Sequence, residues 1–85
     1  MDAAVALAAL SDYCKQNSSF VPRISQLTTR WHAHVAGYDV EVLCTGPKFF
    51  DTRAKKGGGG ALDLTMHLAK LDFKQAVALL RAKGL

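Results

Sequence analysis

The sequence is poor in residues that make covalent or metal cross-links. Its 85 residues include two cysteines, Cys14 and Cys44, and three histidines. Two cysteines cannot form the disulfide framework of a small secreted domain, and a structural zinc site needs four Cys or His ligands at tetrahedral distance. We therefore expect a reduced, cytoplasmic protein without a metal ion or other cofactor, in which Cys44 is a small buried hydrophobe.

The histidines leave one alternative open. His32 and His34 are two residues apart, so on a strand their side chains point the same way and could join Cys44 and His67 around a metal ion. The simpler interpretation is that His32 and His34 are polar positions on one face of a strand.

Long apolar runs and catalytic groupings are also absent. No run approaches the roughly 20 residues of a membrane span, so we expect no membrane partner. His67 and Asp63, four residues apart, are ordinary neighbours on a helix surface. We therefore do not expect an enzyme that acts alone, and we expect the chain to function by binding a partner. With 49% hydrophobic residues, the chain can form one small core, which predicts a single domain over residues 1–85.

Acidic residues are outnumbered. Eleven Lys and Arg face seven Asp and Glu, giving a net charge of +4 and a pI near 9.3. Between residues 46 and 60, Lys48, Arg53, Lys55 and Lys56 are opposed only by Asp51, so +3 of that charge is concentrated there. Clustered positive charge favours an acidic partner such as nucleic acid.

Four consecutive glycines, Gly57 to Gly60, follow the basic segment and lead into a predicted helix. Glycine lets a ligand approach the backbone closely, and a helix start offers unpaired N–H groups, so this junction is a candidate anion site. A Walker A loop does not fit, because Lys55 and Lys56 precede the glycines. The alternative is a flexible, solvated loop.

The apolar pattern predicts an α+β fold. The expected elements are a helix over 2–16 that includes Cys14, an extended linker to residue 22, antiparallel strands over 30–35, 39–44 and 48–52, and helices over 60–69 and 72–83. Asp72 and Gln75 match a capping box at the start of the last helix. We expect the apolar stripes of both C-terminal helices, Phe73 included, to lie in the core.

Phe49 and Phe50 are neighbours on a predicted strand, so they face opposite sides of the sheet. We expect Phe50 to be buried, which leaves Phe49 and Tyr38 as exposed rings on which bases could stack.

The order of these parts resembles the zinc-binding domain of bacterial and phage DNA primases. The resemblance covers residues 30–83 and rests on Phe49-Phe50, the glycines, Ala61-Leu62-Asp63-Leu64, and the helix from Phe73 to Leu80. It implies a zinc-ribbon-like sheet of three antiparallel strands with two C-terminal helices, to which the apolar pattern adds an N-terminal helix with its linker (1–22).

The zinc-ligand positions of that family fall on Trp31, His34, Thr52 and Lys55. Only His34 is of a ligand type, so the chain resembles a zinc-finger-like domain that has lost its metal. In primases this domain helps to hold template DNA while a separate domain joins nucleotides.

The function we expect is that of a DNA-binding accessory module in the primase or DNA replication system of a plasmid, phage or other mobile genetic element, with single-stranded DNA favoured. The expected contact residues are Lys48, Arg53, Lys55, Lys56, Gly57, Gly58, Gly59, Tyr38 and Phe49. One alternative is a zinc-less protein-interaction module that docks on a primase or helicase through an exposed apolar patch. Another is a nucleotide-phosphate sensor at the glycines, for which the sequence offers no base-reading residue.

Overall fold

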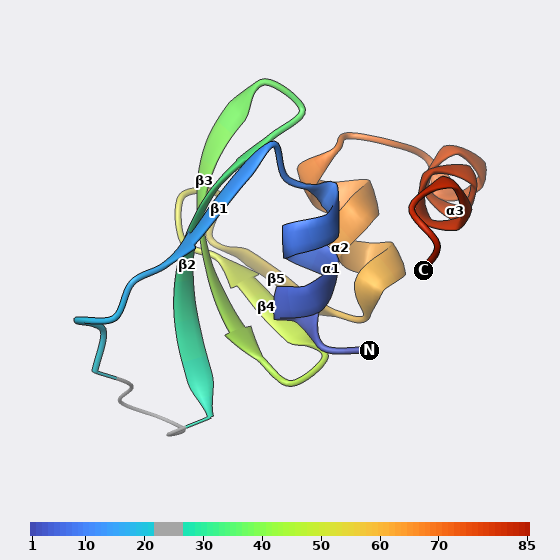
Figure 1. Cartoon of the computed structure of the whole chain (residues 1–85). Coiled ribbons are helices and arrows are strands. Elements are labelled where there is room, and N and C mark those ends of the chain that lie inside the picture. The colour runs from blue at the N-terminus through green and yellow to red at the C-terminus, as the bar shows by residue number, and fades with distance from the viewer. Residues whose placement is uncertain (22–26) are drawn as a thin grey trace.

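A computed structural model describes residues 1–21 and 27–85 as an α+β domain with helices on one face of an antiparallel sheet (Figure 1). The far end of the predicted linker, residue 22, lies outside the described residues. The elements in chain order are α1 (Ala3–Leu10), β1 (Tyr13–Gln16), β2 (Thr28–Val35), β3 (Tyr38–Thr45), β4 (Lys48–Asp51), β5 (Lys56–Gly59), α2 (Ala61–Leu68) and α3 (Phe73–Ala82). None of the described helices is long and apolar enough to cross a membrane.

The sheet has five strands in the order β1-β2-β3-β4-β5. The predicted hairpin is confirmed: Val35 pairs with Tyr38 across a two-residue turn in which Ala36 (φ 50°) and Gly37 (φ 87°) both have positive φ. Such turns match the right-handed twist of the flanking strands. Glycine is common in them because it adopts positive φ without strain. The predicted strand over 48–52 is also present, as β4.

The prediction of a three-stranded sheet is incomplete, because two strands were missed. The helix predicted over 2–16 ends at Leu10, and residues 13–16, Cys14 included, form β1 on the free edge of β2. Pairing with a neighbouring strand outweighs the local preference of the alanine-rich segment. At the other edge, the glycines predicted to form a loop are β5, paired with β4.

Glycine is required in β5 because neighbouring atoms lie too close for a side chain. A Cβ added to Gly57 would lie 2.9 Å from the carbonyl oxygen of Phe49, and one added to Gly58 would lie 3.0 Å from the Phe49 ring. A Cβ at Gly59 would meet nothing within 4 Å. Packing against Phe49 therefore explains Gly57 and Gly58 without any ligand.

The core lies between the sheet and two helices. Side chains alternate along each strand, and those that point to the helices are the buried ones: Ala33, Val35, Val40, Val42, Cys44 and Phe49. Residues from α1 and α2 cover them, among them Leu7, Leu64 and Leu68. Phe49 is 5% exposed and Phe50 is 41% exposed, so the expectation that Phe50 is the buried ring is wrong.

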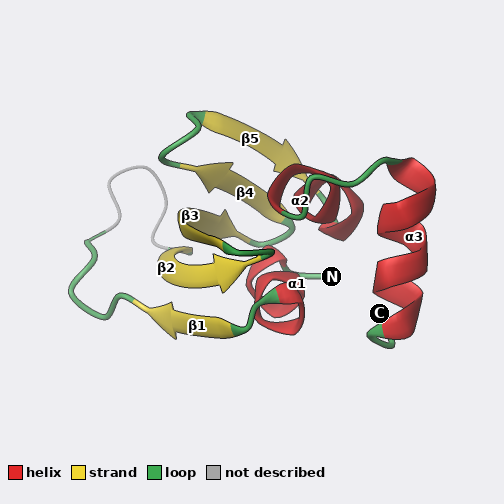
Figure 2. Ribbon diagram, turned by 90° about the horizontal axis from the view of Figure 1, so that it is seen from above, coloured by secondary structure: helices red, strands yellow, loops and turns green. Residues whose placement is uncertain are grey.

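Helix α3 forms an outer layer against α2 (Figure 2). Its predicted capping box is confirmed: the Gln75 N–H donates to Asp72 Oδ1 (2.8 Å) and the Asp72 N–H donates to Gln75 Oε1 (3.2 Å). Ala76 is buried, whereas Phe73 is 60% exposed. The prediction that Phe73 belongs to the core is therefore wrong, because helical spacing identifies an apolar face but does not supply an element to cover it.

Candidate nucleic-acid interface

The sheet face opposite α1 and α2 is not covered by any described helix (Figures 1 and 2). We call it the open face. The alternation that buries one set of strand residues directs the other set here. Its side chains are Tyr13, Lys15, Thr28, Arg30, His32, His34, Asp39, Glu41, Leu43, Thr45, Lys48 and Phe50.

Two exposed aromatic rings lie on the open face. Tyr13 is 54% exposed and Phe50 is 41% exposed. The Tyr13 ring meets the His32 ring edge-on, with centroids 6.4 Å apart and planes at 66°, while Phe50 is paired with Leu43 across the strands. Tyr13 and Phe50 lie three strand spacings apart across the sheet, about 14 Å, and they are also offset along the strands, because Tyr13 is in register with Asp39 whereas Phe50 is in register with Leu43. Exposed flat rings on a sheet are suited to stacking against unpaired bases.

The two carboxylates of the open face are engaged with neighbouring side chains. His32 Nδ1 lies 2.8 Å from Glu41 Oε1, and Arg30 Nε donates to Glu41 Oε2 at 3.2 Å. His34 Nδ1 lies 3.0 Å from Asp39 Oδ1. The hydrogen bond with His32 is the largest cause of a lowered pKa for Glu41, and the one with His34 is the largest for Asp39. Both acids therefore stay ionised and partnered.

Cations flank this network. Lys15 and Lys48 are exposed and have no partner among the described residues. They lie on β1 and β4, on either side of the paired acids. A phosphate chain crossing the open face would therefore meet an unpaired ammonium group near each side.

The turn between β4 and β5 and the first residue of β5, which we together call the basic turn (residues 52–56), add positive charge at this edge of the sheet. Asp51 Oδ1 accepts hydrogen bonds from the N–H groups of Arg53 (3.0 Å) and Ala54 (3.2 Å) and so holds the turn. Arg53 Nη1 donates to the carbonyl oxygen of Asp39 at 3.1 Å, which places Arg53 beside the open face. Lys55 and Lys56 are exposed.

A buried hydrogen bond connects the basic turn to the helices. His67 Nε2 lies 2.8 Å from Asp51 Oδ2, with both side chains largely buried, and the His67 ring stacks on the Phe49 ring at 6.0 Å. Burial raises the pKa of Asp51, but hydrogen bonds from His67 and from the turn N–H groups outweigh burial and leave the pKa below its ordinary value. Sequence reasoning considered only Asp63 as a neighbour of His67.

The predicted contact residues divide between two sides of the sheet. Lys48 lies on the open face, and Arg53 and Lys55 lie in the turn itself. Lys56 is the first residue of β5, in register with the inward-facing Asp51. Gly57 and Gly59 turn to the open face and Gly58 to the helices. Phe49 is buried, so its expected role in base stacking is wrong. Tyr38 is 59% exposed, but it is in register with the inward-facing Val35, on the helix side of the sheet.

The residues missed by sequence reasoning are Tyr13, Lys15, Arg30 and Phe50. The alternation Lys48-Phe49-Phe50 carried a signal for Phe50, since a lysine and the residue two positions later share a strand face.

The alternative metal site is wrong. His32 and His34 lie on the open face, Cys44 lies in the core and His67 is paired with Asp51, so the four do not converge. Across residues 1–21 and 27–85, no group of three His, Cys, Asp or Glu side chains gathers to hold a metal ion. Burial raises the pKa of the Cys44 thiol to about 12.

Comparisons with known proteins give one short match. No known protein family matches the sequence, and no solved structure matches the fold. The "65 kDa protein" of Zymomonas mobilis subsp. mobilis is 54% identical over 33 residues, which are 39% of this chain and 6% of that protein. The match therefore spans a small part of a much longer relative.

Proposed function

We propose that this chain is a single-stranded DNA-binding module that serves a primase or another part of a replication system in a plasmid, phage or mobile element. The observation that carries the proposal is the open face, where Tyr13 and Phe50 stand exposed among unpaired lysines. The sequence resemblance to the zinc-binding domain of primases supports the assignment to replication. The module acts by binding and leaves chemistry to a partner.

Single-stranded DNA fits this surface better than a duplex. In a duplex the flat faces of the bases are stacked on one another, whereas in a single strand they are free to stack on protein aromatics, at about 1–3 kcal/mol per base. Stacking on Tyr13 and Phe50 therefore contributes affinity that depends little on the base sequence. Lys15, Lys48 and the basic turn contact phosphates and make binding sensitive to salt.

The direct test is a fluorescence-anisotropy titration of labelled oligothymidine and of a duplex at two salt concentrations. An oligothymidine of about 12 nucleotides suits the site size of a small single-strand-binding domain, about 4–16 nucleotides. We expect Phe50→Ala to weaken single-strand binding by roughly 5- to 150-fold, which corresponds to one lost stacking contact. Tyr13→Ala should act in the same direction.

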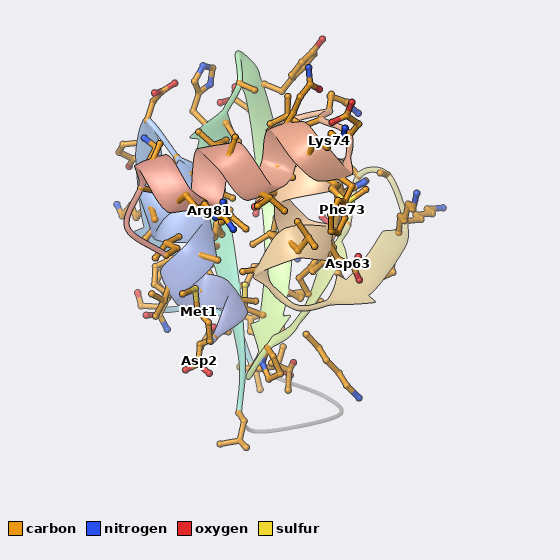
Figure 3. The ribbon with its side chains drawn as sticks, turned by 90° about the vertical axis from the view of Figure 1, so that its right-hand side faces the viewer. Met1, Asp2, Asp63, Phe73, Lys74 and Arg81 are labelled. Carbon is orange, nitrogen blue, oxygen red and sulfur yellow. The ribbon has the colours of Figure 1, made fainter. Side chains whose placement is uncertain are left out.

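Phe73→Ala is the matched control, because Phe73 is also an exposed phenylalanine but lies on α3, on the opposite side of the molecule (Figure 3). It should leave the affinity unchanged. Equal losses in Phe50→Ala and Phe73→Ala, or no binding by the wild-type protein at low salt, would refute the open face as the binding surface.

The same titration tests the basic turn. Replacing Arg53, Lys55 and Lys56 together with alanine should make the slope of log K against log salt concentration shallower by about 0.7 for each lost phosphate contact. A triple replacement of Lys74, Arg81 and Lys83 removes the same charge from the end of the chain and should leave a steeper slope than the basic-turn variant.

A protein-interaction module is the second candidate function. It is favoured by exposed apolar side chains on the helix side, where Met1 (58%), Val5 (54%) and Phe73 (60%) are uncovered. Loss of binding to a primase or helicase in Phe73→Ala, with no DNA binding by the wild-type chain, would favour this candidate over the first.

A further inference from the structure

A cleft lies on the helix side of β5, between that strand and α2. Its volume is about 370 Å³, within the range of about 300–1,000 Å³ typical of small-molecule sites. The lining residues are Phe49, Lys56, Gly57, Asp63, Met66, His67 and Leu71. It therefore combines an apolar wall with one cation and one carboxylate.

The carboxylate is held against the strand. Asp63 is in the first turn of α2, where the helix dipole favours a negative charge, and its Cβ would lie 3.4 Å from a Cβ added to Gly58. Figure 3 shows Asp63 on the helix side of the molecule, below Phe73 in that view. Asp63 is exposed and no described residue pairs with its carboxylate. Its two oxygens are thus free to accept hydrogen bonds.

The walls are flat and rigid. The Phe49 and His67 rings are stacked at 26°, and the hydrogen bond from His67 to Asp51 fixes the imidazole. Met66 and Leu71 add an apolar side. Lys56 is exposed and has no partner among the described residues, so its ammonium group is available for a phosphate.

The cleft adjoins the open face across the edge strand β5, in which Gly57, Gly58 and Gly59 carry no side chain. Gly57 lines the cleft and is also the cross-strand neighbour of Phe50. A single strand that stacks on Phe50 can therefore cross β5 toward the cleft without meeting a side chain at Gly57.

We propose that this cleft binds a guanine nucleotide unit, with the base facing Asp63 and the phosphate near Lys56. A carboxylate is acceptor-only, and guanine is the base that presents two adjacent N–H donors, at N1 and N2, on its Watson–Crick edge. Adenine and cytosine place a ring-nitrogen acceptor beside their amino group, and thymine flanks its single N–H with carbonyls. The unit can belong to a DNA strand or be a free mononucleotide. This assignment rests on the proposed function and deepens it.

Oligonucleotide titration gives the first readout. Wild-type protein should bind oligothymidine containing one guanine about tenfold more tightly than plain oligothymidine, the discrimination typical of one bidentate base contact. Asp63→Asn should abolish this preference and leave the affinity for plain oligothymidine within about twofold, because the other contacts persist. Asp12→Asn, which alters an exposed carboxylate outside the cleft and the strands, should keep the preference.

Free guanosine monophosphate gives the second readout, through the NMR signal of the Met66 methyl group. Guanosine monophosphate should shift it, thymidine monophosphate should not, and Asp63→Asn should remove the shift. Equal oligonucleotide affinities together with an unmoved methyl signal would overturn the cleft assignment while leaving the proposed function intact. A methyl shift without any oligonucleotide binding would support the cleft as a free-nucleotide site and overturn the proposed function.

Discussion

The two faces of the sheet are built from the same strands and have opposite chemistry. Toward the helices, β2 and β3 present Ala33, Val40 and Val42, all buried, and away from the helices they present His32, His34 and Glu41. A shift of register by one residue would exchange the two sets. The comparison teaches that the strands which make the core also position the candidate interface, so stability and binding should separate by face.

Truncation of a core leucine should have the largest effect. Leu64 on α2 is fully buried against the inner face, so Leu64→Ala should lower the free energy of unfolding by about 2–5 kcal/mol. Leu43→Ala, on the open face, should cost less than about half of that, because Leu43 already contacts solvent. Urea denaturation measures both variants, and comparable losses would break the distinction between the faces.

The glycines of β5 should give the second largest effect. Gly58→Ala places a methyl group 3.0 Å from the Phe49 ring and should cost about 1–3 kcal/mol through overpacking. In Gly59→Ala the new methyl group points to the open face and has no atom within 4 Å. This variant should therefore change the free energy of unfolding by less than about 1 kcal/mol. Thermal unfolding of the pair is the measurement. Identical melting temperatures would mean that Phe49 does not set the requirement for glycine.

The smallest expected effect is on the pH dependence of stability and concerns Asp51, the buried acid on the inner side. Its pKa is lowered in the folded state, so its contribution is complete above the unfolded value, about 3.9, and is lost as the pH falls through the folded value. Wild-type protein should therefore lose stability on acidification below about pH 4 more steeply than Asp51→Asn.

Urea midpoints measured at several pH values between 2 and 6 give the slope. Asp2→Asn, whose side chain makes no capping hydrogen bond, serves as control and should keep the wild-type slope. A wild-type slope in Asp51→Asn would mean that the hydrogen bonds of Asp51 do not contribute to the pH dependence of stability.

Much of the fold is predictable because its signals are local. The β2–β3 hairpin follows from alternation around a two-residue turn, and α3 begins at a capping box that is visible as Asp72 and Gln75. The two missed strands lacked such signals. Residues 13–16 form only one short strand after an alanine-rich helix, and the glycines of β5 have no side chains to display a period of two.

The candidate site was less predictable because it depends on which face each strand turns to the helices. Phe49 and Phe50 are both aromatic, so alternation shows that they face opposite sides but not which ring is covered. The pair of Asp51 and His67 joins residues 16 positions apart on different elements, and no spacing rule connects them.

The strand order β1-β2-β3-β4-β5 also has a kinetic consequence. Each strand pairs only with its neighbours in the chain, so the sheet can assemble by closing one short loop after another, each at a small entropic cost. The main distant packing is that of α1 on α2, across most of the sequence. Topologies dominated by local pairing fold quickly, and here the slowest encounter falls to the first helix, which must wait for the rest of the chain.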